Sequence, residues 1–93
     1  MEFEWDPAKD AANLEKHGIG FDDAVFVFRD PLHIVEDSSR PEHGEIHGKA
    51  IGLLFGMVTT VIFTERHGKR RIISARRARR DERVRYDRGT AAG

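Results

Sequence analysis

Arginine dominates the last third of the chain, and its chemistry points to a polyanionic partner. Residues 66–93 contain ten arginines and one lysine against three acidic residues. The planar guanidinium group donates paired hydrogen bonds to phosphate and also stacks on bases. On a helix over this segment, four arginines share one side beside Tyr86: Arg76, Arg79, Arg80 and Arg83. Because this side offers charge for phosphates and a ring for a base, the segment favours a nucleic acid.

Two other interpretations of the arginine-rich segment exist. It could form a solvated helix that pairs internally with Asp81, Glu82 and Asp87. Exposed ion pairs contribute only about 0–1 kcal/mol each, so such pairing does not require so many arginines. It could also dock an acidic protein, since such a partner is attracted to the same surface. We therefore expect a nucleic acid or another acidic partner.

Three residues outside this segment could transfer protons. Lys16 and His17 end a predicted helix, where they could act in proton transfer or simply complement the negative end of the helix dipole. Glu65 ends a predicted strand next to Arg66, and could be a general base or an ion-pair partner. The residues themselves leave these alternatives open.

A metal site is not expected. His43, Glu45 and His47 alternate, so an extended segment would place them on one face, but a predicted loop supplies half of the set. The chain has no cysteine, and it lacks a glycine-rich phosphate loop, a nucleophile elbow and a zinc signature. These absences argue against nucleotide hydrolysis, acyl transfer and metalloprotease chemistry, and we expect no cofactor.

The formal net charge of zero hides an acidic front and a basic back. Residues 1–65 contain five basic and 13 acidic residues, so the front could hold the basic segment in the folded chain. The length of 93 residues predicts one domain, folded over residues 3–88, with a flexible tail at 89–93. No apolar run is long enough to span a membrane and no signal peptide is recognised, so we expect a soluble cytoplasmic protein.

The elements that position these residues predict an α+β domain with a mostly antiparallel sheet. A strand at residues 3–5 precedes a helix with Asp6 as N-cap and Gly18 as C-cap, which ends near Lys16. We expect a second helix ended by Pro31, a weak strand at 32–36, a loop at 37–44 and a C-terminal helix over 77–88. The apolar side of the first helix is expected at Ala8, Ala11, Ala12 and Leu14, and that of the second at Phe21, Ala24, Val25 and Phe28.

Three further strands are predicted at residues 46–54, 57–64 and 69–76. Turns between them fall at Phe55-Gly56 and His67-Gly68. The strand over 57–64 is apolar on both faces in its middle, so it should be central in the sheet.

A series of short motifs resembles the BrnT family of bacterial type II toxin–antitoxin ribonucleases. Each motif is weak alone, but together they run in order from Phe3 to Tyr86. They are Phe3-Glu4-Trp5-Asp6-Pro7-Ala8-Lys9, Asn13, Lys16-His17-Gly18, Phe21, Asp30-Pro31, Ala50-Ile51-Gly52, Thr64-Glu65-Arg66, Arg71-Ile72-Ile73-Ser74-Ala75-Arg76, and Glu82-Arg83 with Tyr86.

The resemblance implies a small RelE-like fold, metal-independent cleavage of RNA and inhibition of translation. It also implies a BrnA-like antitoxin with a ribbon-helix-helix part, a complex of two toxins with two antitoxins, and contact with operator DNA only through the antitoxin. The chain departs from the family's pattern at His47, where arginine is common, and at Gly20, where serine or aspartate is common.

The arginines and the resemblance together suggest a mechanism. RNA supplies its own nucleophile, the 2′-hydroxyl group, so the protein must transfer protons and stabilise the charged transition state. Arg76 and Arg83 are expected to stabilise the phosphate charge, and Lys16, His17 or Glu65 to move protons. Arg66, Arg77, Arg79 and Tyr86 are expected to position the RNA. The alternative is a non-catalytic module that binds RNA or DNA through the same arginines.

Overall fold

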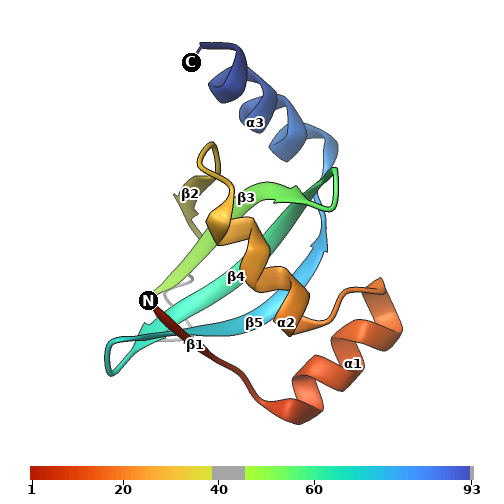
Figure 1. Ribbon diagram of the computed structural model, residues 1–93, viewed down its shortest axis with the longest axis vertical. Coiled ribbons are helices and arrows are strands. Elements are labelled where there is room, and N and C mark those ends of the chain that lie inside the picture. The colour runs from red at the N-terminus through yellow and green to blue at the C-terminus, as the bar shows by residue number, and fades with distance from the viewer. Residues whose placement is uncertain (39–45, 93) are drawn as a thin grey trace.

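A computed structural model describes residues 1–38 and 46–92 of the chain. In this part of the chain five strands form one sheet in the order β1-β5-β4-β3-β2, antiparallel except between β1 and β5 (Figure 1). The predicted α+β class is therefore confirmed. The elements are β1 (Glu2–Glu4), α1 (Pro7–His17), α2 (Phe21–Ala24), the 3-10 helix η1 (Val25–Arg29), β2 (Ile34–Asp37), β3 (His47–Leu54), β4 (Met57–Arg66), β5 (Lys69–Arg77) and α3 (Arg80–Ala92).

Both predicted hairpin turns are confirmed, and β4 is the central strand. In each two-residue turn both residues have positive φ: 50° and 81° at Phe55 and Gly56, and 51° and 77° at His67 and Gly68. These are type I′ turns, whose twist matches that of the paired strands. Glycine adopts positive φ freely, whereas a bulky residue such as Phe55 does so only at a cost.

The predicted ends of α1 are confirmed. The Asp6 side chain accepts a hydrogen bond from the backbone N–H of Ala8, and Gly18 ends the helix with φ 73°. The predicted apolar side is wrong, because Ala8, Ala11, Ala12 and Leu14 are all exposed. The buried residue of α1 is Asn13. The helix therefore meets the sheet through a polar contact.

Asn13 closes an open edge of the sheet. Its Nδ2 donates to the carbonyl oxygens of Ile19 and Ala75, at 2.9 and 2.8 Å, and its Oδ1 accepts from the Ala75 N–H at 3.1 Å. β1 pairs with β5 only over residues 69–71, so Ala75 has no strand on that side. The amide thus satisfies the backbone groups that a missing strand would leave unpaired.

Replacing Asn13 with alanine is expected to lower the free energy of unfolding by about 2–4 kcal/mol. The change leaves buried backbone groups without partners, and each such group costs about 1–3 kcal/mol. Urea unfolding measures the loss, with Leu14→Ala on the exposed side of α1 as the control. Equal stability of the two variants would contradict this role of Asn13.

The apolar side predicted for the second helical segment is confirmed, with one residue missed. Phe21 and Ala24 are fully buried, and Val25 and Phe28 are partly buried and pack against the core, but Val27 is also fully buried. The reason is the change from α2 to η1, because a 3-10 helix has three residues per turn and keeps positions i, i+3 and i+6 on one side.

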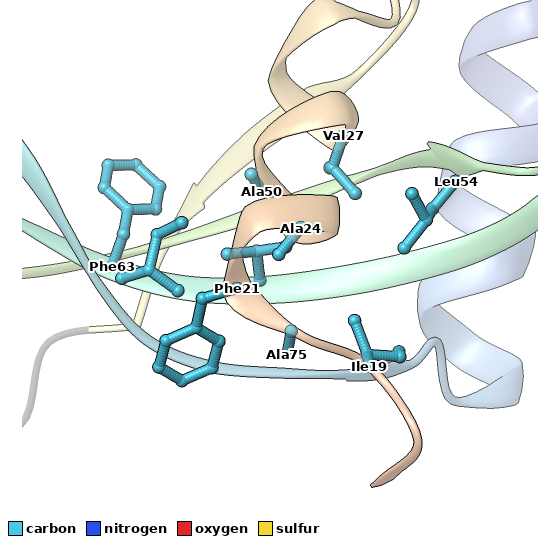
Figure 2. Close-up of a cluster of buried hydrophobic side chains, with 10 residues drawn as sticks. Ile19, Phe21, Ala24, Val27, Ala50, Leu54, Phe63 and Ala75 are labelled. Atoms are coloured by element: carbon cyan, nitrogen blue, oxygen red, sulfur yellow. The ribbon is translucent and has the colours of Figure 1, made fainter. Parts of the chain in front are cut away.

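The three fully buried side chains form the core with one face of the sheet. In Figure 2 they gather with Ile19 and with residues of β3, β4 and β5, and we call this side of the sheet the core face. The strand residues labelled there are Ala50, Leu54, Phe63 and Ala75.

The C-terminal region differs from the prediction at both ends. β5 continues to Arg77 and α3 begins at Arg80, so Arg76 lies on a strand and not on the helix. The helix continues to Ala92, so the tail expected at 89–93 is helical over 89–92. The predicted loop at 37–44 falls largely on residues outside the described part of the chain.

Candidate functional site

Eight of the ten arginines of the basic segment fall into two groups. Four of them are held by acidic side chains or aromatic rings: Arg70, Arg71, Arg76 and Arg85. Arg71 lies 3.8 Å from Glu4, and Arg85 binds Glu36 of β2 at 2.6 Å. The acidic front of the chain therefore does hold part of the basic segment, as the charge distribution predicted.

The second group is exposed and surrounds the passage from β5 into α3. It consists of Arg77, Arg79, Arg80 and Arg83, which we call the exposed arginine cluster. Within the described residues no ion pair or hydrogen bond engages their guanidinium groups. Like charges gathered in this way raise the local positive potential and attract a polyanion. This corner of the molecule is the candidate site.

Glu82 fixes the start of α3 next to this cluster. Its carboxylate is 1% exposed and binds Arg76 through two hydrogen bonds, of 2.7 Å from Nη1 and 3.0 Å from Nη2. Lys49 of β3 lies 2.9 Å away, and the hydroxyl group of Thr60 on β4 donates at 3.0 Å. One carboxylate thus joins α3 to three strands.

The same carboxylate also caps the helix. Glu82 Oε1 accepts the backbone N–H of Arg79 at 2.8 Å, and the N–H of Arg83 donates to the carbonyl oxygen of Arg79. This is the half of a capping box in which the third helical residue reaches back to the residue before the helix. Glu82 therefore sets where Arg79 and Arg83 lie relative to the sheet.

Hydrogen bonding decides the charge state of Glu82. Burial alone would raise the pKa of its carboxyl group, but donors on Arg76, Arg79 and Lys49 outweigh burial and hold that pKa far below its ordinary value. The group is therefore ionised wherever the protein is folded near neutral pH. An ionised carboxylate is what the two cations beside it require.

Tyr86, which we expected to stack on RNA, lies inside the structure. Its side chain is 4% exposed and its hydroxyl group donates to Asp30 Oδ2. The backbone N–H groups of Leu32 and Leu53 donate to the same carboxylate. Burial would raise the pKa of Asp30, but these donors, with Tyr86 first, lower it. The ring therefore offers almost no surface to a base, and the residue anchors α3.

The single tyrosine of the chain permits a direct test of this anchor. Burial and the hydrogen bond to Asp30 raise the pKa of Tyr86 from 10.0 to about 12. Because the folded pKa is raised, this contribution to stability is complete below pH 10 and is lost as the pH rises toward 12. Titration by tyrosinate absorbance should show the raised midpoint, with the urea-unfolded chain as control. Equal midpoints in the two states would contradict the burial of Tyr86.

The other predicted site residues lie elsewhere. Lys16 and His17 end α1, which packs against β5, whereas α3 packs against β3 and β4. No hydrogen bond or ion pair in the described residues joins Lys16 or His17 to the exposed arginine cluster. Glu65 lies 3.4 Å from Arg70, beside Arg66 near the far end of β4. It is five residues from Thr60, the partner of Arg76, or roughly 17 Å along the strand.

Two residues of the Glu82 site were missed from the sequence. Lys49 and Thr60 lie on neighbouring strands whose pairing brings both to the face opposite the core. A signal was available, because Lys49 is the one Lys, Arg, Asp or Glu in the predicted strand at 46–54. A charged residue amid apolar neighbours often has a specific partner.

No group of three or more potential metal ligands occurs in the described ranges, while His43 and Glu45 fall outside them.

The structure thus defines a small single-sheet α+β domain with a polyanion-attracting corner where the last strand passes into the last helix. A family model described as the ribonuclease toxin BrnT of type II toxin–antitoxin systems matches residues 5–82. The match covers most of the chain, which therefore belongs to the BrnT family of ribonuclease toxins. A search of curated proteins finds no match. None of the described helices is long and apolar enough to cross a membrane.

Proposed function

We propose that this protein is a cytoplasmic toxin that cleaves RNA without a metal ion and so inhibits translation. A BrnA-like ribbon-helix-helix antitoxin neutralises it in a complex of two toxins and two antitoxins, and operator DNA is contacted through the antitoxin. Family membership supports the ribonuclease and the existence of an antitoxin. The observation that carries the proposal for the site is the exposed arginine cluster, held beside the buried Glu82.

The chemistry needs little more than charge and position from the protein. The 2′-hydroxyl group attacks the adjacent phosphorus and the 5′-oxygen leaves, so negative charge increases on the phosphate in the transition state. Preorganised cations aimed at this charge are usually the largest catalytic contribution. The guanidinium groups of the cluster are available for this role because no acidic side chain among the described residues engages them.

We assign two roles to the arginines: some contact the RNA, and others hold the start of α3 in position. We assign the phosphate contact in the transition state to Arg83, with Arg77 and Arg79 binding the flanking strand. Arg76 donates both of its terminal nitrogens to Glu82, so it positions the start of α3 and thereby Arg79 and Arg83. Tyr86 supports the same helix through Asp30. These roles move Arg76 and Tyr86 from RNA contact to positioning.

The identity of the residues that transfer protons is a separate proposal. Lys16, His17 and Glu65 are still candidates by residue type, but no contact with the cluster supports them. Arg66, beside Glu65, could bind RNA only as a second contact, because it is remote from Arg76 along the sheet. The contacts described above therefore support the assignment of the charge-stabilising arginines, and they do not identify the general acid or the general base.

The test is cleavage of a labelled RNA by the purified chain in EDTA. Fragments with 2′,3′-cyclic or 3′-phosphate ends are expected, and they should be absent with an Arg79→Ala/Arg83→Ala variant that keeps the Glu82 contacts. Cleavage that requires added Mg²⁺ would contradict the metal-independent mechanism. Unfolding of the variant by urea checks that both proteins are folded.

No candidate proton-transfer group within residues 1–38 and 46–92 contacts the exposed arginine cluster, and this favours a second candidate function, a non-catalytic module that binds RNA or DNA. The two functions predict the same salt dependence, since both rest on phosphate contacts. They differ in the products. Tight binding with no cleavage, even after ribosomes are added, would support the binding module.

A further inference from the structure

Two aromatic rings stand exposed at the tip of the β3–β4 hairpin. Phe55 is 74% exposed and Phe26 of η1 is 43% exposed, with ring centroids 6.1 Å apart. The guanidinium group of Arg29 lies over the Phe26 ring, 5.0 Å from its centroid. Arg29, Phe26 and Phe55 thus form a short row of contacts outside the core, with the two rings tilted by 42°, and we call this row the aromatic stack.

The backbone at Phe55 is unfavourable for this residue. Type I′ turns favour asparagine, aspartate or glycine at the first position, because φ is positive there. The equivalent position of the other hairpin is His67, and histidine tolerates this conformation better than most residues. A large apolar residue that is both strained and exposed is not explained by folding. Strain of this kind is typical of functional positions.

The aromatic stack lies beside the exposed arginine cluster. The N–H of Ala78 donates to the carbonyl oxygen of Val58 at 3.0 Å, and Arg77 pairs with Thr59. Met57, which is also exposed, begins β4 two residues before Thr59, or roughly 7 Å along the strand. Figure 1 shows this hairpin tip next to the passage from β5 into α3. Exposed rings and exposed guanidinium groups therefore lie at the same corner of the molecule.

We propose that the aromatic stack is the base-binding subsite for single-stranded RNA. An unpaired base stacks on Phe55, with Phe26 supporting the ring, while Arg77 and Arg79 bind the adjacent phosphates. This rests on the proposed function in taking RNA as the substrate, and it replaces Tyr86 with Phe55 as the aromatic that meets the base. Every base can stack on an aromatic ring, so the subsite increases affinity for RNA and positions the strand with little dependence on the nucleotide sequence.

The charges around the stack favour RNA over an apolar protein segment. Arg29, Arg77 and Arg79 are cations, and the nearby acidic group Asp30 already accepts hydrogen bonds from Tyr86 and two backbone groups. A strand of RNA uses the rings and the cations together. A purely apolar segment uses the rings alone and leaves the cations with nothing to bind.

The test replaces Phe55 with asparagine. RNA affinity, measured by anisotropy of a labelled single strand, should fall roughly 5- to 100-fold, the range that loss of one stacked aromatic causes. The slope of affinity against salt should not change, because no phosphate contact is removed. Stability should be equal or higher, because asparagine suits the turn. Leu14→Asn, which also replaces an exposed apolar residue, should bind RNA as the unchanged protein does.

A second variant reports stacking directly. Phe55→Trp in a Trp5→Phe background leaves one indole in the chain, since Trp5 is the only natural tryptophan. Its fluorescence should be quenched by RNA and not by heparin, which carries charge but no bases. Quenching by both polyanions, or by neither, would overturn the stacking role.

The outcomes separate this inference from the proposed function. RNA cleavage by the unchanged protein, with equal RNA affinity in Phe55→Asn, overturns the subsite and leaves the nuclease. If Phe55→Asn binds RNA more weakly but the unchanged protein does not cleave RNA, the subsite is supported and the proposed nuclease activity is contradicted. Equal RNA affinity with weakened antitoxin binding overturns the subsite and makes the stack a protein contact. Absence of RNA binding by the unchanged protein overturns both.

Discussion

Replacing Glu82 with alanine is expected to lower the free energy of unfolding by about 3–5 kcal/mol. Removing one partner of a buried ionic network leaves the others as uncompensated charges, and this is the usual cost. Arg76 and Lys49 are largely buried, so water cannot fully replace the lost carboxylate. The variant also loses the cap of α3. Urea unfolding at neutral pH measures the change.

The control and the acid dependence sharpen this prediction. Arg83→Ala, on the same turn but exposed, should change stability by less than about 0.5 kcal/mol. Because folding lowers the pKa of Glu82, its contribution is complete above the ordinary value of 4.5 and is lost as the pH falls below it. The unchanged protein should therefore lose more stability on acidification than Glu82→Ala. Parallel acid profiles, or a loss under 1 kcal/mol at neutral pH, would contradict the role of Glu82.

Replacing Arg83 with alanine is expected to reduce RNA cleavage by about 10²–10³-fold while the protein stays folded. The magnitude is that of one lost donor to a transition-state charge. Arg83 makes no ion pair in the described part of the chain, so its loss removes nothing that holds α3. The measurement is the single-turnover rate of cleavage of a labelled RNA in EDTA.

A neighbouring arginine provides the matched control. Arg88→Ala removes an exposed charge from the same helix but outside the exposed arginine cluster, and it should retain most of the cleavage. Arg83→Lys keeps the charge and loses the paired donors, so an intermediate rate is expected. If Arg83→Ala cleaves at the full rate, Arg83 is not the phosphate contact. Arg76→Ala should lose cleavage and stability together, because it acts through Glu82.

The sequence predicts best where structure depends on neighbouring residues. Asp6 and Gly18 bound α1 through their own backbone and side-chain chemistry, and the two hairpin turns follow from the glycines at 56 and 68. The two-sided apolar pattern placed β4 at the centre. Each of these features requires only a few adjacent residues.

The candidate site depends on contacts between distant segments, and there the prediction was incomplete. A glutamate is exposed by default, so nothing local indicates that Glu82 is buried against Lys49 and Thr60. Helical periodicity grouped Arg76 with Arg83, although the strand predicted at 69–76 already contains Arg76 and β5 ends at Arg77. Nothing near Tyr86 in the sequence indicates that its ring is buried, because its partner, Asp30, lies 56 residues earlier.

The parallel pairing of β1 with β5 has a consequence for synthesis of the protein. β1 is synthesised well before its partner residues 69–71 in β5. Contacts between segments this far apart in sequence form late in folding. The exposed arginine cluster and Glu82 follow residues 69–71 in the chain, so a product of translation interrupted at those residues lacks both. The proposed activity therefore requires synthesis to have passed the start of α3.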